Sequence, residues 1–597
     1  MRNLKICQVR VTDVKSQALV CFQMRFTNSR LGFFLLSAIT GLLVGATTVA
    51  LIECIDFLQN IFFGELTSDD PDEMQSRFSG WSVLLAPILG GIVISLMLRV
   101  IPGQRVHGIA DVMEASALRA GKMDVRSGIT AAFATTVSLG TGTPLGREGP
   151  AVHIGASLTS WLAERFNLKR AQSLTLLGCA AAAAVTASFN TPIAGVIFAL
   201  EVVVGYYALR VFAPVVVAAM GAVIVRHSVY GNRPEFSLPD YQIGSLWELP
   251  AFAMLGFIAA LLVQVFIYLV ACCRAGYDMA TIPVWVRPVF GGIFIGVVAL
   301  YYPLALGVGY EGTALALNEN LPLAILAALL IAKVLGGAVA LGSGMPGGVF
   351  SPALFIGAMF GGVFWYIAQL LVPVELSSQG VYSVVGMAAI ASAMLGAPIS
   401  TLLIVFELTI DYDLVIAVML AAAMASTFMQ LMPHSSFFRW QLAIRGINLN
   451  TGRDQGLLRT KTIDEYVTQK FIRVDQGATL SAVESSMYAH RRYIAIVLNG
   501  EEEFIGSLST DELAAGVVNN RDAMCDTAMN AAEHAIPSST SLLAALQFLN
   551  ERDTNYAPVT KTGDDTEEVV GVIYRSDVMK ALYEMMRAAR SEEYGVT

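Results

Sequence analysis

The sequence GTGTPLGREGPAVHIGA at residues 140–156 recurs as GSGMPGGVFSPALFIGA at residues 342–358. At a constant offset of 202, nine of the seventeen positions are identical, without a gap. The identical pairs include Gly146 with Gly348 and Pro150 with Pro352. A gapless match of this kind indicates a duplicated unit around which the rest of the chain is organised.

Each copy predicts a loop that opens a helix, because a proline suits the first helical turn, where its missing N–H costs nothing. The free N–H groups and the positive dipole end at a helix start attract an anion. Two such starts in corresponding halves of a membrane protein indicate a substrate site near the midplane. We therefore predict anion passage. The alternative is that the glycines only allow close helix packing.

The composition predicts a polytopic membrane protein that is mostly α-helical. Of 597 residues, 55% are hydrophobic and 14% charged, and the mean hydropathy is +0.61. The net charge of -9 argues against nucleic acid as a partner. The seven cysteines and six histidines show no metal-ligand spacing, and no nucleophile motif stands out. We predict neither a metal site nor an enzyme.

The organisation follows from changes in composition along the chain. Residues 1–30 form a basic arm, cytoplasmic by the positive-inside rule and not a cleavable signal. Residues 31–446 form the membrane domain, with repeats at about 31–230 and 248–446. Its short apolar runs predict broken re-entrant helices at 109–118, 151–162, 192–204 and 352–364. Residues 447–460 are a linker, and residues 461–597 a small soluble α/β domain.

A second pair of positions supports the duplication. Pro192 is followed nine residues later by Glu201, and Pro398 nine residues later by Glu407. A carboxylate in an apolar helix is costly and is a functional candidate by default. The alternative is a structural residue that caps a neighbouring helix.

The C-terminal domain resembles a tandem pair of CBS modules. Two strand-like runs end in equivalent segments, GSLSTDE at 506–512 and GVIYRSD at 571–577. This resemblance implies an adenine nucleotide between the modules, with Glu512 and Asp577 near its ribose. Tyr574 replaces the usual serine or threonine of the second copy, and a purely structural dimerisation role is an equal alternative.

The membrane domain resembles the CLC chloride channels and chloride/proton antiporters, on the motifs GREGP at 146–150 and GVFSP at 348–352. The resemblance implies a homodimer in a lipid membrane, with one pore per subunit and two inverted halves. Glu148 matches the external gating glutamate, which competes with the anion when ionised and leaves when protonated. The implied anion-binding residues are Gly146, Gly149, Val349 and Phe350.

Three positions depart from the family pattern. His107 stands where the family's first motif has a serine that donates to the anion, and a pore-facing donor role and a packing role are both open. Phe438, or Phe437 if the alignment shifts by one, replaces a tyrosine and leaves only a hydrophobic ring. Val202 replaces the internal proton glutamate, and Glu201 is then the remaining carboxylate for a proton path with Glu148.

The leading interpretation is a channel-like pathway for chloride or a similar small anion, gated by Glu148, with no required cofactor. One alternative is a chloride/proton antiporter that uses another inner proton route. Another is a nucleotide-sensing receptor without transport. We expect a bacterial inner membrane, with both termini cytoplasmic. The sequence does not decide voltage dependence or anion selectivity.

Overall fold

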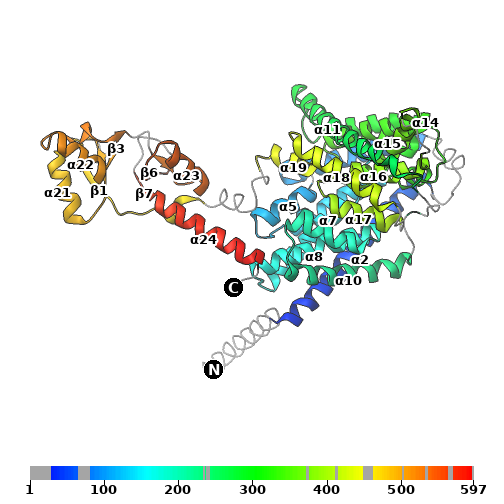
Figure 1. Cartoon of the computed structure of the whole chain (residues 1–597), viewed down its shortest axis with the longest axis horizontal. Helices are drawn as coiled ribbons and strands as arrows, with labels where there is room; N and C mark the ends of the chain where they lie inside the picture. The colour runs from blue at the N-terminus through cyan, green and yellow to red at the C-terminus, as the bar shows by residue number, and fades with distance from the viewer. Residues whose placement is uncertain are drawn as a thin grey trace, which may run out of the picture. The chain divides into compact units, whose positions relative to one another are not determined.

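The computed structural model describes residues 29–64, 81–105, 107–232, 236, 243–371, 376–409, 414–447, 462–500, 503–531, 535–561 and 569–594. The chain divides into two compact units, Met1–Asn448 and Leu449–Thr597, coloured blue to yellow and yellow to red in Figure 1. Nearly all of the predicted N-terminal arm and linker, and Val106 of the first family motif, lie outside the described residues.

The first unit is helical, and its helices form two series in the same order. The first series is α2 (Arg30–Phe63), α4 (Trp81–Val100), α5 (Ile109–Leu118), α6 (Val125–Gly140), α7 (Glu148–Arg165), α8 (Arg170–Phe189), α9 (Pro192–Phe198) with η2 (Ala199–Val204), and α10 (Leu209–Tyr230). The second series is α11 (Leu249–Met279), α12 (Arg287–Tyr301), α13 (Tyr310–Leu317), α14 (Leu323–Gly342), α15 (Phe350–Leu371), α16 (Gln379–Leu395), α17 (Pro398–Thr409) and α18 (Val415–Leu431). Helix α19 (Phe437–Ile444) follows.

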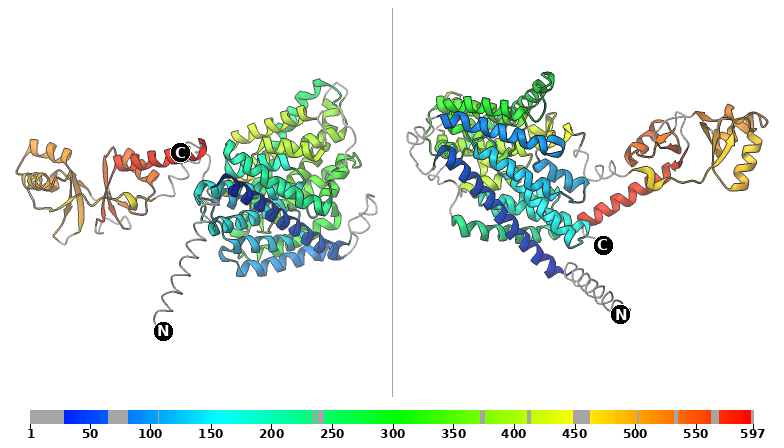
Figure 2. Two further views of the ribbon diagram at one scale, coloured as in Figure 1. Left: turned by 90° about the horizontal axis from the view of Figure 1, so that it is seen from below. Right: turned by 180° about the vertical axis from the view of Figure 1, so that it is seen from behind.

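Helix lengths are uneven, as predicted. Among the described residues, seven helices are long and apolar enough to cross a membrane. Helix α2 has 34 residues and crosses the unit as one long diagonal element (Figure 2). At 1.5 Å per residue it spans about 51 Å, more than a bilayer core of about 30 Å, so it must tilt. Two helices are longer than predicted: α7 covers Glu148–Arg165 rather than 151–162, and α15 covers Phe350–Leu371 rather than 352–364. In α15 the residues after 364, WYIAQLL, are largely apolar and continue the helix.

Small residues let equivalent helices of the two series meet. Helices α4 and α12 pack together, and a Cβ atom on Gly91 would collide with the carbonyl of Pro288. The equivalent Gly292 faces the carbonyl of Pro87 in the same way. This reciprocal contact places α4 beside its own counterpart. The centre of the unit holds α8 and α16, whose residues are almost entirely buried, and each packs against the helix that starts at a repeated motif.

The second unit contains the same α/β module twice. In the first, β1 (Ile472–Asp475) pairs parallel with β2 (Ile494–Leu498), which pairs antiparallel with β3 (Phe504–Ser509). In the second, β5 (Ile536–Pro537), β6 (Tyr556–Thr560) and β7 (Gly571–Tyr574) repeat this pattern. The remaining elements are β4 (Asn530–Ala531), the helices α21 (Leu480–His490), α22 (Thr510–Asn519), α23 (Leu542–Glu551) and α24 (Arg575–Tyr594), and the short helices η5 (Ile463–Tyr466) and η6 (Cys525–Thr527).

Candidate functional site: the meeting point of the repeated loops

The two repeated loops, residues 141–147 (the first loop) and 343–349 (the second loop), meet inside the first unit. Gly146 N donates to Gly348 O at 2.8 Å, and Gly348 N donates to Gly146 O at 2.6 Å, in an antiparallel bridge. Equivalent residues that pair antiparallel run in opposite directions, as inverted repeats require. Helices α7 and α15 begin directly after this bridge, at Glu148 and Phe350.

The Glu148 side chain occupies the space between the two helix starts. It is fully buried, and Ser351 Oγ of the second copy donates to its Oε1. Its other oxygen, Oε2, has no hydrogen-bond partner among the described residues. A Cβ atom on Gly146 would collide with Oε2, so the glycine is required for the carboxylate to lie here. A single buried carboxylate therefore fills the gap between two helix N-termini, where an anion would bind.

A small cavity of about 80 Å³ adjoins the first loop, and Arg147 is one of the residues that line it. Arg147 is buried, with its guanidinium 5.1 Å from the Tyr310 ring centre. Its Nη2 donates to Ser188 O at 3.3 Å. A second buried cation, Lys333, binds the segment that includes the lining residues Gly307 and Val308: its Nζ donates to the carbonyl oxygens of Ala305 (3.0 Å), Gly307 (2.7 Å) and Val308 (3.3 Å).

A larger cavity of about 450 Å³, here called the large cavity, is lined by the second loop and by Gly149 in the first turn of α7. Its wall brings together four of the predicted anion-binding residues: His107, Gly149, Val349 and Phe438. Gly146 lies in the bridge between the loops. The ring of Phe350 packs against Phe189 and Phe198, with ring centres 4.6 and 6.2 Å apart, so only its backbone lies at the loop. Four arginines and two aspartates complete the charge of this wall: Arg105, Arg274, Arg287, Arg445, Asp111 and Asp278.

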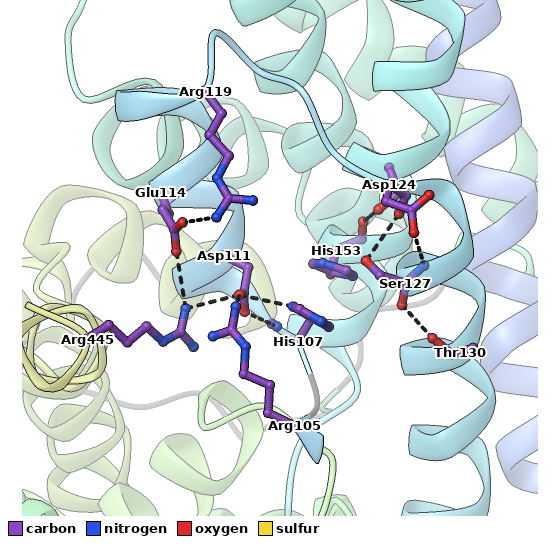
Figure 3. Close-up of polar contacts among 12 residues, drawn as sticks. Arg105, His107, Asp111, Glu114, Arg119, Asp124, Ser127, Thr130, His153 and Arg445 are labelled. Atoms are coloured by element: carbon purple, nitrogen blue, oxygen red, sulfur yellow. Dashed lines mark hydrogen bonds and ion pairs between the residues drawn. The ribbon is translucent and has the colours of Figure 1, made fainter. Parts of the chain in front are cut away.

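His107 lies at the start of α5 in a charged cluster (Figure 3). Its Nδ1 is 3.1 Å from Asp111 Oδ1, and the other oxygen of Asp111 accepts from Gly108 N at 2.9 Å. Arg105 and Arg445 each contact Asp111 Oδ1 at 3.0 Å. The Asp111 carboxylate thus caps α5 and holds His107 at the cavity wall.

Comparison with known proteins decides the family. The model for voltage gated chloride channels matches residues 89–430, more than half of the chain. The chain belongs to the CLC family. A putative chloride channel protein, ClcB-like, from Ralstonia nicotianae is 31% identical over 396 residues, covering 64% of this chain and 91% of the relative. Proteins of the CLC family are anion channels and transporters rather than enzymes, and this one is an integral membrane protein.

Two solved structures have the same fold. A slow cyanobacterial Cl⁻/H⁺ antiporter matches with a TM-score of 0.60 at 18% identity, covering 69% of this chain and 97% of its own. A eukaryotic CLC transporter matches with a TM-score of 0.58 at 18% identity, covering 91% of this chain and 97% of its own. A CBS model matches residues 526–584, the second module of the C-terminal unit.

The structure also places the two other positions at which this CLC protein departs from the family pattern, the phenylalanine aligned with the family tyrosine and Val202. Phe437 and Phe438 both line the large cavity, so either alignment with the family tyrosine places a ring without a hydroxyl there. Val202 is buried within η2, which packs against α5.

The glutamates of the second repeated pair cap each other's helices. Glu201 accepts from Ile399 N at 3.2 Å and from Ser400 N at 2.8 Å, at the start of α17. Glu407 accepts from Ile193 N at 3.0 Å and Ala194 N at 2.7 Å, at the start of α9. Both carboxylates are therefore engaged as helix caps, the alternative role weighed from the sequence.

In the CBS unit, Glu512 and Asp577 occupy equivalent positions in the first turns of α22 and α24. The Glu512 carboxylate accepts from Ser509 N, from Asn530 Nδ2 and from the Tyr556 hydroxyl at 3.0 Å. Burial, and then the Glu512 carboxylate, raise the pKa of Tyr556 above its usual range, which keeps the hydroxyl a donor. Because Tyr556 belongs to the second module, Glu512 joins the two modules.

Sequence reasoning missed two residues of the site, Ser351 and Lys333, and the contact between Asp111 and Arg445. Ser351 was inside the quoted motif, at the position of Gly149, but nothing in the sequence showed that its hydroxyl would reach Glu148. Lys333 could have been found, because a lysine within an apolar run is a signal in itself. The contact of Asp111 with Arg445 joins residues 334 positions apart and had no local signal.

Proposed function

We propose that the chain conducts chloride or a similar small anion between the two cavities, past the meeting point of the loops, with Glu148 as the gate. The observation that carries this proposal is the position of the Glu148 carboxylate, buried between the starts of α7 and α15 and bonded to Ser351. An ionised carboxylate and an anion compete for the same helix-end dipoles, so the pathway opens when Glu148 is protonated.

We further propose that transport is channel-like rather than coupled to protons. The position of the internal proton glutamate is Val202, which cannot carry a proton. Glu201 is committed to the N–H groups of α17, and Glu407 stands in the same relation to α9. Moving a proton through Glu201 would break the cap of α17.

Liposome flux with a pH electrode tests this proposal. The purified protein should release chloride down its gradient without moving protons. Uphill proton movement driven by chloride would instead assign an antiporter with another inner route. Absence of anion flux, together with tight nucleotide binding, would favour a receptor without transport.

The arginine-rich wall of the large cavity supports a cytoplasmic position for that cavity, because cytoplasmic ends carry the excess of Lys and Arg. We extend the proposal to a homodimer with one pathway per subunit, in a bacterial inner membrane. Both termini are then cytoplasmic. Cross-linking in native membranes and protease access to the C-terminal unit test these assignments.

The proposed role of the CBS pair is regulatory. Glu512 and Asp577 remain the predicted ribose contacts, but Glu512 would have to exchange its bond with Tyr556 for one to a nucleotide. Titration of the intact protein with ATP measures this binding, and Tyr556→Phe, which removes one of the three donors to Glu512, should strengthen it.

A further inference from the structure

The tautomer of His107 is fixed by its neighbour Asp111. A carboxylate ion has only acceptor atoms, and two guanidinium groups at 3.0 Å favour the ionised form of Asp111. The His107 nitrogen 3.1 Å from Asp111 Oδ1, Nδ1, must therefore be the donor in this contact. In a neutral imidazole one nitrogen carries the hydrogen and the other is a bare acceptor. The neutral ring of His107 thus presents a lone pair, not an N–H group, at Nε2.

The Nε2 atom is the His107 nitrogen that Asp111 does not engage. Among the described residues it has no hydrogen-bond partner, and the side chain is 20% exposed in the wall of the large cavity. Gly149 and Val349, which belong to the two helix starts, line the same cavity. An anion that enters from this cavity meets a repelling lone pair if His107 is neutral and a charged N–H donor if it is protonated.

We propose that His107 is a proton-dependent anion contact: it binds an anion through Nε2 only as imidazolium, so that one proton is taken up with the anion. This inference rests on the proposed anion pathway and deepens it. The linkage is reciprocal, since a bound anion strengthens proton binding at His107 by the factor by which the proton strengthens anion binding.

The neighbouring histidine limits the site to a single proton. His153 of α7 stacks on His107 with ring centres 5.3 Å apart and planes inclined by 14°. It is 1% exposed, and its Nδ1 has no hydrogen-bond partner in the described part of the chain. A second positive charge against the first, in a buried position, is unfavourable. The other charged groups around the pair, on α5, α19 and the opposite wall, are Asp111, Glu114, Arg105, Arg445, Arg274, Asp278 and Arg287.

Isothermal titration calorimetry with chloride tests this linkage. The experiment uses the Glu148→Ala variant, because this substitution removes the proton that Glu148 itself could bind. Titrations in two buffers of different ionisation enthalpy give the number of protons taken up per anion. We expect up to about one proton per chloride, and an affinity that falls by up to about tenfold per pH unit at high pH.

The decisive comparison adds His107→Ser to the same protein, because a hydroxyl donates without a proton. Chloride should still bind, with no proton uptake and an affinity independent of pH. His107→Gln is the second variant, of similar size, should the serine variant not fold. His153→Phe, which installs the residue of the equivalent position 355, should retain the proton uptake.

Proton uptake that persists in both His107 variants, or that is lost only in His153→Phe, overturns the role of His107. Binding with no proton uptake in the Glu148→Ala protein also overturns it. Absence of chloride binding in every folded variant at every pH would instead refute the anion pathway, and with it this proposal.

Discussion

The two copies of the repeated motif, residues 140–156 and 342–358, have similar backbones but carry different side chains at the start of the helix. The first copy places Glu148 and His153 where the second places Phe350 and Phe355. The carboxylate of the first copy stands between the helix starts, whereas the ring of the second turns away and packs against Phe189. Duplication therefore accounts for the paired helix starts of the proposed anion site, and divergence of one side chain accounts for the proposed gate. Both halves supply backbone N–H groups at a helix start, but only the first half supplies a carboxylate that can compete with an anion for them.

The largest expected effect comes from removing the charge that distinguishes the first copy. Glu148→Gln should raise chloride flux at neutral pH. It should also abolish the dependence of that flux on the pH of the solution on the side of the membrane from which Glu148 is protonated. In the unsubstituted protein, flux should rise as this pH falls, by up to about tenfold per unit, the limit for one proton. Radiolabelled chloride efflux measures both. The matched control in the second copy, Phe350→Leu, should keep the pH dependence, and its loss there would end the distinction between the copies.

The next effect separates the two bridging glycines. A Cβ atom at Gly348 would lie 3.0 Å from Gly149 N and 3.3 Å from Gly146 O, which are both backbone atoms, so Gly348→Ala should push the loops apart and lower flux strongly. At Gly146 the nearest atom is the flexible Glu148 carboxylate, and the nearest backbone atom, Ser351 N, lies farther away, at 3.2 Å. Gly146→Ala should therefore conduct with a weakened pH dependence. Flux and thermal stability are compared in the two variants. Equal behaviour of both would contradict the asymmetry described above.

A smaller effect is expected where the two halves are chemically alike. Glu201→Gln and Glu407→Gln should each weaken a helix cap and lower the free energy of unfolding by about 1 kcal/mol. Denaturation in detergent measures this loss, and proton movement in liposomes should be unchanged in both. If Glu201→Gln alone alters proton movement, Glu201 lies on a proton path and the channel-like assignment fails.

The smallest effect is expected in the CBS unit. Tyr556→Phe removes the hydroxyl that bonds to Glu512, and should destabilise the contact between the modules by about 1 kcal/mol. Hydrogen exchange of the intact protein should show faster exchange in β6, with chloride flux unaltered. Unchanged exchange in β6 would mean that this bond does not hold the modules together.

Local patterns in the sequence predicted the parts of this structure that depend on local chemistry. Both repeated motifs open helices, with Pro150 and Pro352 in the first turns, and α5 spans the predicted residues 109–118. Contacts between distant residues were not predictable, because one sequence does not record which helices meet. The engagement of Glu201 by α17 shows this best: its position in an apolar run was evident, but its partner Ser400 was 199 residues away.

Crystallography of Glu148→Ala and unsubstituted protein in bromide tests the central claim most directly, because bromide scatters anomalously and replaces chloride. We expect bromide between the amides of the second loop and α15 in both proteins, and an additional ion beside Ser351 when the Glu148 carboxylate is absent. No ion between the two helix starts in either protein would contradict it.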